Sequence, residues 1–414
     1  MATSAIGMQP LPSEPLGASA PPFVVIGTPG DRRVDLFLAA LHALRLPPAQ
    51  IIPYTAIIDG RAALREHLAA GAIVRIESPG KDPTIENRLI AVGAGVADAP
   101  GLSRIAADDA LRLPIERGRL RYVRQWYLGL RATLEEIDRQ LVACPPHYRM
   151  NNLPAIALMF DKPACHARLD QCGIPVPRAL GSPPSFEALR EAMRQLRCSR
   201  VFVKLAHGSS AAGVVAYQVS GDRQLALTTV EMVHERGELR LYNSRRLRAY
   251  RDQRDIQVLI DALCRERVHV EQWLPKAGIA DRRFDLRVVV IGGRARHVVV
   301  RLSRGPMTNL HLLNERGDVA AVRSRMGLAA WNAAMDTCTR TVAALGPNLY
   351  AGVDLLIRAD YRQHAVLEVN AFGDLLPGVL DEGQDTYTAE ILAALERWHI
   401  TKAYDQRSSS GRHA

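Results

Sequence analysis

The 414-residue sequence lacks several features that would place it in a common class. No run approaches the roughly 20 apolar residues of a membrane-spanning helix, so no membrane partner is expected. The six cysteines form no CxxC pair and no zinc-finger spacing, which predicts reduced thiols and a cytoplasmic location. Residues 1–22 lack a basic segment followed by a long apolar stretch, and they are predicted to be a disordered arm rather than a signal peptide.

The net charge of +10 is distributed unevenly along the chain. Residues 1–100 hold 8 Lys and Arg against 9 Asp and Glu, so the cationic excess lies in the rest of the chain. The positive electrostatic field of this cationic excess can attract nucleic acid, ATP, carboxylates or an acidic peptide. Because the basic segments are not interleaved with aromatic residues, a nucleic-acid partner is not favoured. The preferred interpretation is an arginine-rich surface around an anion site.

Residues 23–100 alternate apolar strands with amphipathic helices. We expect strands at 23–27, 51–54 and 72–76, and helices at 31–44 and 59–70. Repeated βα units predict a parallel sheet covered by helices. The turn Gly27–Gly30 lacks the full GxGxxG motif, so a tight βα turn is favoured there over an anion site.

The pattern changes further along the chain. A long amphipathic helix is predicted at 120–143, and a second helix after residue 150 carries Asp161 and Lys162. From residue 201 the segments are typical of antiparallel strands, with a hairpin across Gly292-Gly293. The predicted fold class is therefore α/β and α+β.

Two apolar runs near the C-terminus carry oxygen ligands, Asp354 in the first and Glu368 and Asn370 in the second. Residues two apart in a strand point to the same face, so Glu368 and Asn370 would point together, with Asp354 joining from a neighbouring strand. Hard oxygen ligands on a rigid sheet suit Mg²⁺, which usually arrives with nucleotide phosphates. A buried, unpaired carboxylate costs several kcal/mol, which favours the metal interpretation.

Groups suited to a nucleotide occur upstream of these ligands. Lys162 and Lys204 supply two cations, and the small Gly-containing loop 207–213 could lie over phosphates with its amides pointing inward. Asp285 and Arg287 share one face of a strand, and Arg301 follows on the paired strand.

The order of these motifs resembles the ATP-grasp superfamily, particularly its glutathione-synthetase-like and RimK-type ligases. The matching strings are DKxxxxxxL from Asp161, FVKLAHGSSAAGV, VEQWLPK, DLRVVVIGG, the stretch from Arg301 to Leu310, GVDLL and LEVNAFGDLLPG. They cover roughly residues 150–380, and the N-terminal βα segment fits the family's first domain. The resemblance implies an ATP-grasp fold with an N-terminal parallel βα domain, a small lid domain and a C-terminal antiparallel-sheet catalytic domain.

The resemblance also implies a division of the chain into segments. They are an arm at 1–22, a βα domain at 23–120, a helical connector at 121–160, a lid subdomain at 161–275, a catalytic subdomain at 276–404 and a loose tail at 405–414.

The family's binding roles can be carried over to matching positions. The resemblance implies phosphate contacts from Lys162, Lys204 and the loop residues Gly208, Ser209, Ser210 and Gly213. It implies an adenine hinge at Glu271, Gln272, Trp273 and Leu274, with Lys276, Asp285 and Asn309 as further nucleotide-site residues. For Lys276, Asp285 and Asn309 an ordinary structural role is the favoured alternative.

The same resemblance implies catalytic and metal-binding roles. Arg287 would steady the γ-phosphate, and Arg301 would hold an acyl phosphate or a substrate carboxylate. Asp354, Glu368 and Asn370 would bind Mg²⁺.

The implied activity is an ATP- and Mg²⁺-dependent ligation of a carboxylate and an amine, on a small molecule or peptide, through an acyl phosphate. Two alternatives stay open: a kinase that stops after phosphate transfer, and a nucleotide-binding regulatory or scaffold protein without turnover. Homo-oligomerisation is also left open.

Two stretches depart from the family's pattern or match no motif. The family often has a small residue and Pro-Gly after the last metal ligand, whereas this chain has Ala371-Phe372-Gly373-Asp374. Asp374 would suit a cationic amine substrate or cap the following turn. The Arg-rich stretch 236–254 could contact an acidic peptide, but a role in shielding the domain is favoured.

Overall fold

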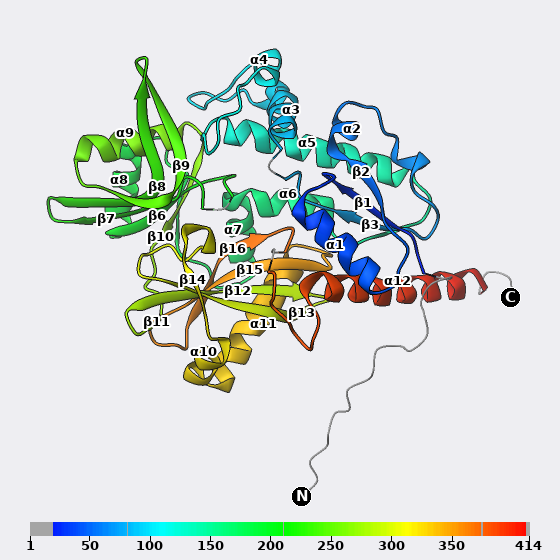
Figure 1. The fold of residues 1–414 in the computed structure, drawn as a ribbon. Coiled ribbons are helices and arrows are strands. Elements are labelled where there is room, and N and C mark those ends of the chain that lie inside the picture. The colour runs from blue at the N-terminus through cyan, green and yellow to red at the C-terminus, as the bar shows by residue number, and fades with distance from the viewer. Residues whose placement is uncertain (1–19, 81, 210, 374–375, 411–414) are drawn as a thin grey trace, which may run out of the picture.

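Three sheets organise the computed structural model, which describes residues 20–80, 82–209, 211–373 and 376–410 (Figure 1). The first sheet is parallel and the other two are antiparallel, which confirms the α/β and α+β class. Most of the predicted arm, residues 1–19, lies outside the described residues, as do residues 411–414.

The first sheet has the strand order β2-β1-β3-β4. Its strands are β1 (Phe23–Gly27), β2 (Gln50–Pro53), β3 (Ile73–Ile76) and β4 (Tyr148–Arg149). The helices of this part are α1 (Arg32–Ala43), α2 (Tyr54–Ile58), α3 (Pro83–Gly93), α4 (Ala107–Leu111) and α5 (Val123–Val142). Every residue of β1 and β3 is buried, as expected for strands of a covered parallel sheet.

The helix predicted at 59–70 is wrong. The helical segment is α2, which ends one residue before Asp59. Gly60 follows with a φ of +67°, a left-handed conformation that commonly stops a helix.

The second sheet has the order β5-β10-β6-β7-β8-β9 and is antiparallel throughout. Its strands are β5 (Ala179–Gly181), β6 (Arg200–Leu205), β7 (Val215–Ser220), β8 (Arg223–Glu235), β9 (Glu238–Tyr250) and β10 (Val268–Gln272). Helices α8 (Phe186–Gln195) and α9 (Gln253–Cys264) pack on it. This sheet has a hydrophobic core of its own, so it forms a separate packing unit.

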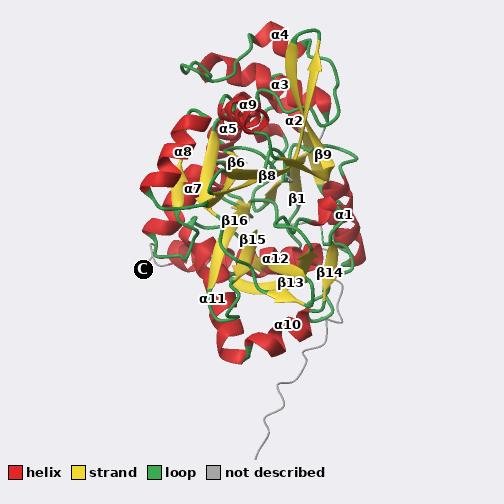
Figure 2. Cartoon of the chain, turned by 90° about the vertical axis from the view of Figure 1, so that its left-hand side faces the viewer, coloured by secondary structure: helices red, strands yellow, loops and turns green. Residues whose placement is uncertain are grey.

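The third sheet has the order β14-β13-β12-β15-β16, with β11 paired to β12. Its strands are β11 (Gly278–Ile279), β12 (Arg282–Ile291), β13 (Arg294–Ser303), β14 (Glu315–Gly317), β15 (Tyr350–Ile357) and β16 (His364–Asn370). Helices α10 (Val319–Met326) and α11 (Leu328–Ala344) cover it on one side, and Figure 2 shows both below the sheet. The hairpin predicted across Gly292-Gly293 is confirmed.

Two short helices connect the first sheet to the second. The single helix predicted to carry Asp161 is in fact α6 (Leu153–Phe160) and α7 (Lys162–Gln171). Asp161 separates them because its side chain accepts a hydrogen bond from the Ala164 amide and so caps α7. Lys162 is therefore the first residue of a helix rather than an interior one.

The long β8–β9 hairpin of the second sheet reaches a segment that precedes α5. The Leu120 amide donates to the Leu241 carbonyl at 2.9 Å, and the Asn243 amide donates to that of Gly118 at 2.6 Å. The hairpin thus holds the second sheet against a segment that belongs in sequence to the N-terminal domain.

The last helix, α12 (Thr386–Ser410), packs beside α1 and also contacts β12 of the third sheet (Figure 1). Residues 405–410, predicted as part of a loose tail, are helical, since adding residues to an existing helix is far easier than starting one. No helix among the described residues is both long and apolar enough to cross a membrane.

A sealed ion cluster joins α12 to the first sheet. Arg75 of β3 has its guanidinium 2.8 Å from Glu77 and 2.7 Å from Glu390 of α12. All three side chains are at most 3% exposed. The rings of Phe37, Tyr350 and Tyr387 lie 4.5–5.4 Å from the same guanidinium.

Candidate active site

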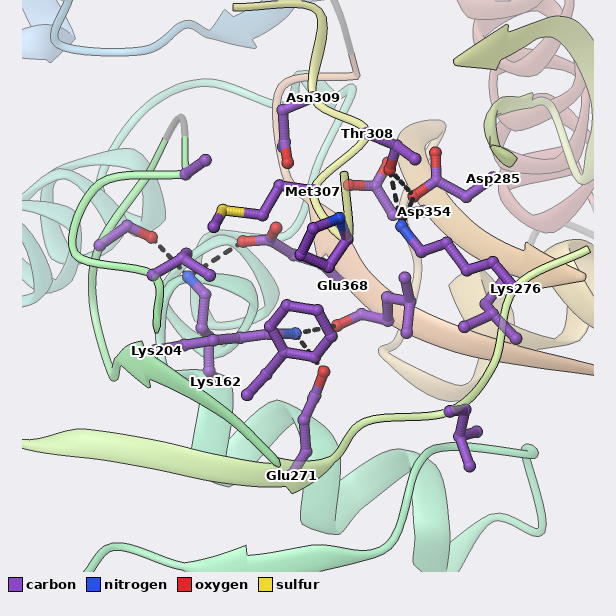
Figure 3. Close-up of a pocket in the computed structure, with 18 of the residues that line it drawn as sticks. Lys162, Lys204, Glu271, Lys276, Asp285, Met307, Thr308, Asn309, Asp354 and Glu368 are labelled. Atoms are coloured by element: carbon purple, nitrogen blue, oxygen red, sulfur yellow. Dashed lines mark hydrogen bonds and ion pairs between the residues drawn. The ribbon is translucent and has the colours of Figure 1, made fainter. Parts of the chain in front are cut away.

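A cavity lies between the second and third sheets (Figure 3). It encloses about 690 Å³ of empty space, part of it open to solvent. Strands β6 and β10 contribute residues on one side, and β12, β15 and β16 on the other. Its apolar lining residues include Phe202, Leu205, Val214, Leu274, Met307, Leu356 and Leu367. Apolar side chains combined with convergent polar groups are typical of the lining of a small-molecule site.

Two lysines enter this cavity, and each contacts a carboxylate. Lys162 Nζ lies 2.9 Å from Glu368 Oε1 and also donates to the Gly208 carbonyl. Lys204 Nζ lies 2.5 Å from Glu271 Oε1. Both lysine side chains are 13% exposed, so an anion in the cavity can compete with the glutamates for them.

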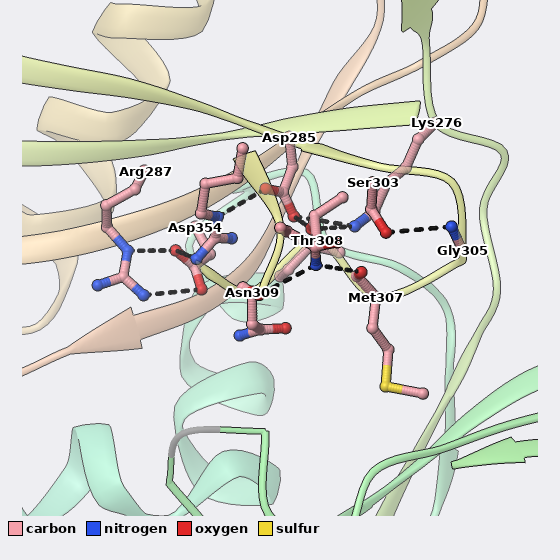
Figure 4. A network of polar contacts seen from close by, with 12 residues as sticks. Lys276, Asp285, Arg287, Ser303, Gly305, Met307, Thr308, Asn309 and Asp354 are labelled. Atoms are coloured by element: carbon pink, nitrogen blue, oxygen red, sulfur yellow. Dashed lines mark hydrogen bonds and ion pairs between the residues drawn. The ribbon is translucent and has the colours of Figure 1, made fainter. Parts of the chain in front are cut away.

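Asp285 of β12 is the centre of a buried polar network on the opposite wall (Figure 4). Its carboxylate accepts from Lys276 Nζ at 2.9 Å and from Arg301 Nε at 2.7 Å, and also from the Thr308 hydroxyl. Lys276 in turn donates to Thr308 Oγ1 at 2.7 Å. This network fixes the segment that carries Thr308 against the third sheet.

Asp354 of β15 extends this network. Arg287 reaches both of its carboxylate oxygens, with Nη2 3.1 Å from Oδ2, and Arg301 Nη1 lies 3.1 Å from Oδ1. Cross-strand register explains the first contact, because Arg287 and Asp354 are direct partners in the β12–β15 ladder. A guanidinium that grips a carboxylate through two nitrogens holds it in one orientation.

These contacts decide the protonation states of the network. Burial alone would raise the pKa of Asp285, but Arg301 and Lys276 outweigh it and hold that pKa below its ordinary value. The pKa of Asp354 is likewise lowered, by Arg287 and Arg301 against the effect of burial. Burial lowers the pKa of Lys276, and Asp285 opposes the shift.

The charges that line the cavity are balanced. The lining has four cations, Lys162, Lys204, Lys276 and Arg301, and four carboxylates, Glu271, Asp285, Asp354 and Glu368. Arg287 adds a further cation behind Asp354. An anionic ligand can therefore bind by replacing the glutamates as partners of Lys162 and Lys204.

The fold is similar to those of several solved structures. The ATP-grasp ligase PsnB, solved with a minimal precursor, is 17% identical in sequence and superposes with a TM-score of 0.51 over 92% of this chain and 99% of PsnB. The D-cycloserine synthetase DcsG is 15% identical, with a TM-score of 0.51 over 91% of this chain and 99% of DcsG.

This chain has the ATP-grasp fold. The likeness covers nearly the whole chain, including the first sheet, so the fold expected from the sequence motifs is confirmed. No protein-family model matches the sequence, and no curated protein matches it significantly. At such low identity the likeness establishes the fold alone.

Most of the residues singled out from the sequence line the cavity between the second and third sheets, here named the ATP-grasp cavity. Those that line it are Lys162, Lys204, Gly208, Glu271, Gln272, Leu274, Lys276, Asp285, Arg301, Asn309, Asp354 and Glu368. Those that do not are Ser209, Gly213, Trp273, Arg287 and Asn370, and Ser210 lies outside the described residues. Trp273 instead packs against Phe202, with ring centroids 5.3 Å apart.

Sequence reasoning missed several lining residues. Thr308 was not singled out, although it bridges Lys276 and Asp285. Leu356 could have been found, because it lies two residues after Asp354 and shares its face of the strand. Met307 has no signal of its own in the sequence, since its place depends on how the loop after β13 folds back.

Two of the three expected metal ligands, Asp354 and Glu368, line the ATP-grasp cavity. Asp354 and Glu368 are direct partners in the β15–β16 ladder, and both line the cavity. No group of three or more His, Cys, Asp or Glu side chains within the described ranges is arranged to hold a metal. Mg²⁺ commonly takes one or two carboxylates and completes its shell with phosphate oxygens and water. The residues therefore fit a cation held jointly with a nucleotide, not a site built by protein alone.

Proposed function

We propose that this protein is an ATP- and Mg²⁺-dependent ligase that joins a carboxylate to an amine through an acyl phosphate. The observation that carries the proposal is the pair Lys162 and Lys204 facing Asp354 and Glu368 across one cavity of an ATP-grasp fold. Two proteins with this fold are described as a ligase and a synthetase, which supports the same reaction class.

The cavity's two ends suit the two ends of ATP. The adenine would lie in the apolar part near Phe202 and Leu274, beside the polar groups of Gln272. The phosphates would lie at Lys162 and Lys204, where they replace the glutamates as lysine partners. Mg²⁺, held by Glu368 and Asp354 with the phosphates, would neutralise charge on the transferring group. Asn370 is kept as a ligand in this proposal, although it does not line the cavity.

The proposed reaction has two steps. A substrate carboxylate oxygen attacks the γ-phosphorus of ATP, and the bond to the bridging oxygen breaks to release ADP. The amine then attacks the acyl carbon, the carbon–oxygen bond to phosphate breaks, and the nitrogen loses a proton. Charge on the transferring group must be stabilised without water, since water would hydrolyse the acyl phosphate.

The two arginines have different places in this scheme. Arg301 lines the cavity, which suits contact with the acyl phosphate or the substrate carboxylate. Arg287 lies behind Asp354 and grips it through two nitrogens, so it acts as a positioning residue for that carboxylate. The sequence-based role of Arg287 as a direct γ-phosphate ligand is therefore replaced in this proposal.

An acyl-phosphate trap tests the proposal without knowledge of the natural amine. Purified protein is incubated with ATP, Mg²⁺ and a panel of carboxylic acids, with hydroxylamine as the nucleophile, and ADP, phosphate and hydroxamate are measured. Equal amounts of all three products, dependent on the acid, are expected. A phosphorylated product without phosphate release would replace ligation by a kinase reaction. ATP binding without turnover across the panel would favour a scaffold protein.

Glu368→Gln is the sharpest variant for this assay. It removes a carboxylate charge at constant size, so we expect turnover to fall by about a hundredfold or more, while urea unfolding changes little because Glu368 is 27% exposed. Glu396→Gln, at an exposed position of α12, is the matched control and should retain full activity. Full activity of Glu368→Gln would contradict the metal assignment.

A further inference from the structure

A second cavity adjoins the ATP-grasp cavity and has no role in the reaction proposed above. It encloses about 730 Å³ of empty space, part of it open to solvent. Its walls come from β9, the start of β12 and the loop between β13 and β14. Met307 lines both cavities, so a single loop separates them.

Strand β9 departs from regular pairing where it forms a wall of this cavity. Thr228 pairs with Arg248, and Val230 pairs with Asn243. An advance of two residues along β8 is therefore matched by five residues along β9. Residues 244–247 lie opposite the single residue Thr229 and form an enlarged bulge, and bulges redirect the side chains that they carry. Here the bulge brings Arg245 and Leu247 to the cavity wall.

The loop that separates the cavities is held in place by its own hydrogen bonds. Asn314 Nδ2 donates to the carbonyls of Met307 and Asn309, at 2.9 and 3.0 Å. The Gly305 amide donates to Ser303 Oγ at 3.0 Å. Leu247 of the bulge lies against this loop, since a Cβ built on Gly305 would be 3.5 Å from Leu247 Cδ2. These contacts fix the position of the loop between the two cavities.

Arginine dominates the polar lining. The lining contains Arg245, Arg282 and Arg304 against one carboxylate, Glu315. Arg282 pairs with that glutamate, and Arg304 Nε lies 3.1 Å from Asp281 at the rim. In the part of the chain that the structure describes, no ion pair involves Arg245. The cavity thus keeps a positive charge that its own residues do not neutralise.

The apolar part of the lining is aliphatic. Leu302, Leu312 and Leu313 join Leu247 and Met307 around the arginines. A ligand that matches both features has a hydrocarbon chain and an acidic group at its end.

We propose that this second cavity, the arginine subsite, binds a second acidic group of the carboxylate substrate. This inference rests on the proposed function, because it places the reacting carboxylate in the adjoining ATP-grasp cavity. Thr308 and Asn309 line that cavity one and two residues after Met307, so a substrate that extends over this loop would contact both cavities. A dicarboxylic acid and an acidic peptide share this chemistry.

The test measures acid binding separately from turnover. The probe is a fluorescein-labelled triglutamate peptide, titrated with the full-length protein and followed by fluorescence anisotropy. The double variant Arg245→Ala/Arg304→Ala should weaken binding by about tenfold or more, since each removed guanidinium takes charge-assisted hydrogen bonds with it. Its binding of a fluorescent ATP analogue should stay within about twofold of wild type, because neither arginine lines the ATP-grasp cavity.

The matched control removes the same amount of charge from exposed positions of the β8–β9 hairpin. Arg236 and Arg246 are exposed and do not line the subsite, so Arg236→Ala/Arg246→Ala should change triglutamate binding by less than about twofold. Equal weakening by both double variants would show attraction by the general field and overturn the subsite. Equal binding of triglutamine, or no binding of triglutamate, would also overturn it.

Competition identifies the source of the acidic group. Unlabelled glutarate that displaces the probe supports a dicarboxylic acid, and displacement by unlabelled triglutamate alone supports an acidic peptide. The two proposals fail in different ways. Arginine-dependent triglutamate binding without ADP formation in the hydroxylamine assay rejects the ligase and leaves an acid-binding subsite. ADP formation with triglutamate binding unchanged in Arg245→Ala/Arg304→Ala rejects the subsite alone.

Discussion

Two buried ion clusters among the described residues differ in what encloses them. The cluster around Asp285 and Asp354 borders a cavity and contains three cations, Lys276, Arg287 and Arg301, for these two carboxylates. The cluster around Arg75 is closed by aromatic rings and has one cation between two glutamates. Ion pairs beside a cavity can exchange partners with a ligand, whereas sealed ion pairs have no alternative partner. We therefore expect substitutions to affect function in the first cluster and stability in the second.

The largest expected effect is that of Arg75→Met. It leaves Glu77 and Glu390 buried without their cation, and breaking a buried pair in this way costs about 3–5 kcal/mol. Urea unfolding measures the loss. The control is Arg104→Met, which removes an arginine from an exposed pair with Asp98 and should cost less than about 1 kcal/mol. A similar small change in both variants would mean that the sealed cluster does not stabilise the fold.

The next largest effect is a pH dependence set by Glu390. Burial raises the pKa of Glu390 from its ordinary value of 4.5 to about 7, against the opposing effect of Arg75. The folded state then binds a proton that the unfolded state releases, so the free energy of unfolding should fall as pH rises from about 4.5 to about 7. The shift corresponds to roughly 3 kcal/mol across that window.

Glu390→Gln removes this titration and should flatten that part of the stability profile. The measurement is urea unfolding at several pH values between about 4.5 and about 8 for both proteins. The exposed Glu382→Gln is the control and should keep the wild-type slope. Parallel profiles for wild type and Glu390→Gln would show that another group is responsible.

The smallest effect on stability is expected beside the cavity. Lys162→Met leaves Glu368 partly solvated, so the free energy of unfolding should change by less than about 1 kcal/mol. Affinity for a fluorescent ATP analogue should fall by about tenfold, because a phosphate contact is lost. Arg112→Met, at an exposed position, should alter neither quantity. A large loss of stability with normal nucleotide affinity in Lys162→Met would reverse the contrast between the two clusters.

The sequence allowed prediction of contacts that depend on local spacing. Glu368 and Asn370 were expected to share one face of a strand because they are two residues apart, with Asp354 joining from a neighbouring strand. Strands β15 and β16 pair Asp354 directly with Glu368. The Gly292-Gly293 hairpin follows from turn chemistry. Contacts that depend on long-range register could not be predicted in this way. The contact of Arg287 with both carboxylate oxygens of Asp354 requires the alignment of β12 with β15. No local sequence pattern specifies this alignment.

The same limit applies to other structural features that the sequence did not predict. Lys276 was implied as a nucleotide-site residue with a structural role favoured, but its contact with Thr308 depends on a loop that returns from β13. The Arg-rich stretch 236–254 gave no structural signal for the bulge at 244–247, because arginine is compatible with regular and irregular strands alike. The helix at 59–70 failed because Gly60 takes a left-handed conformation.

The pairing of Arg75 with Glu390 has a consequence for biosynthesis. The two residues are 315 positions apart, and at about 5–20 residues per second the ribosome needs roughly 15–60 s to pass from one to the other. During that time the first sheet exists without α12, and Arg75 lacks one of its two carboxylates. The first sheet can therefore reach its final packing only after Glu390 has left the ribosome, and until then α12 cannot cover the Arg75 side of that sheet.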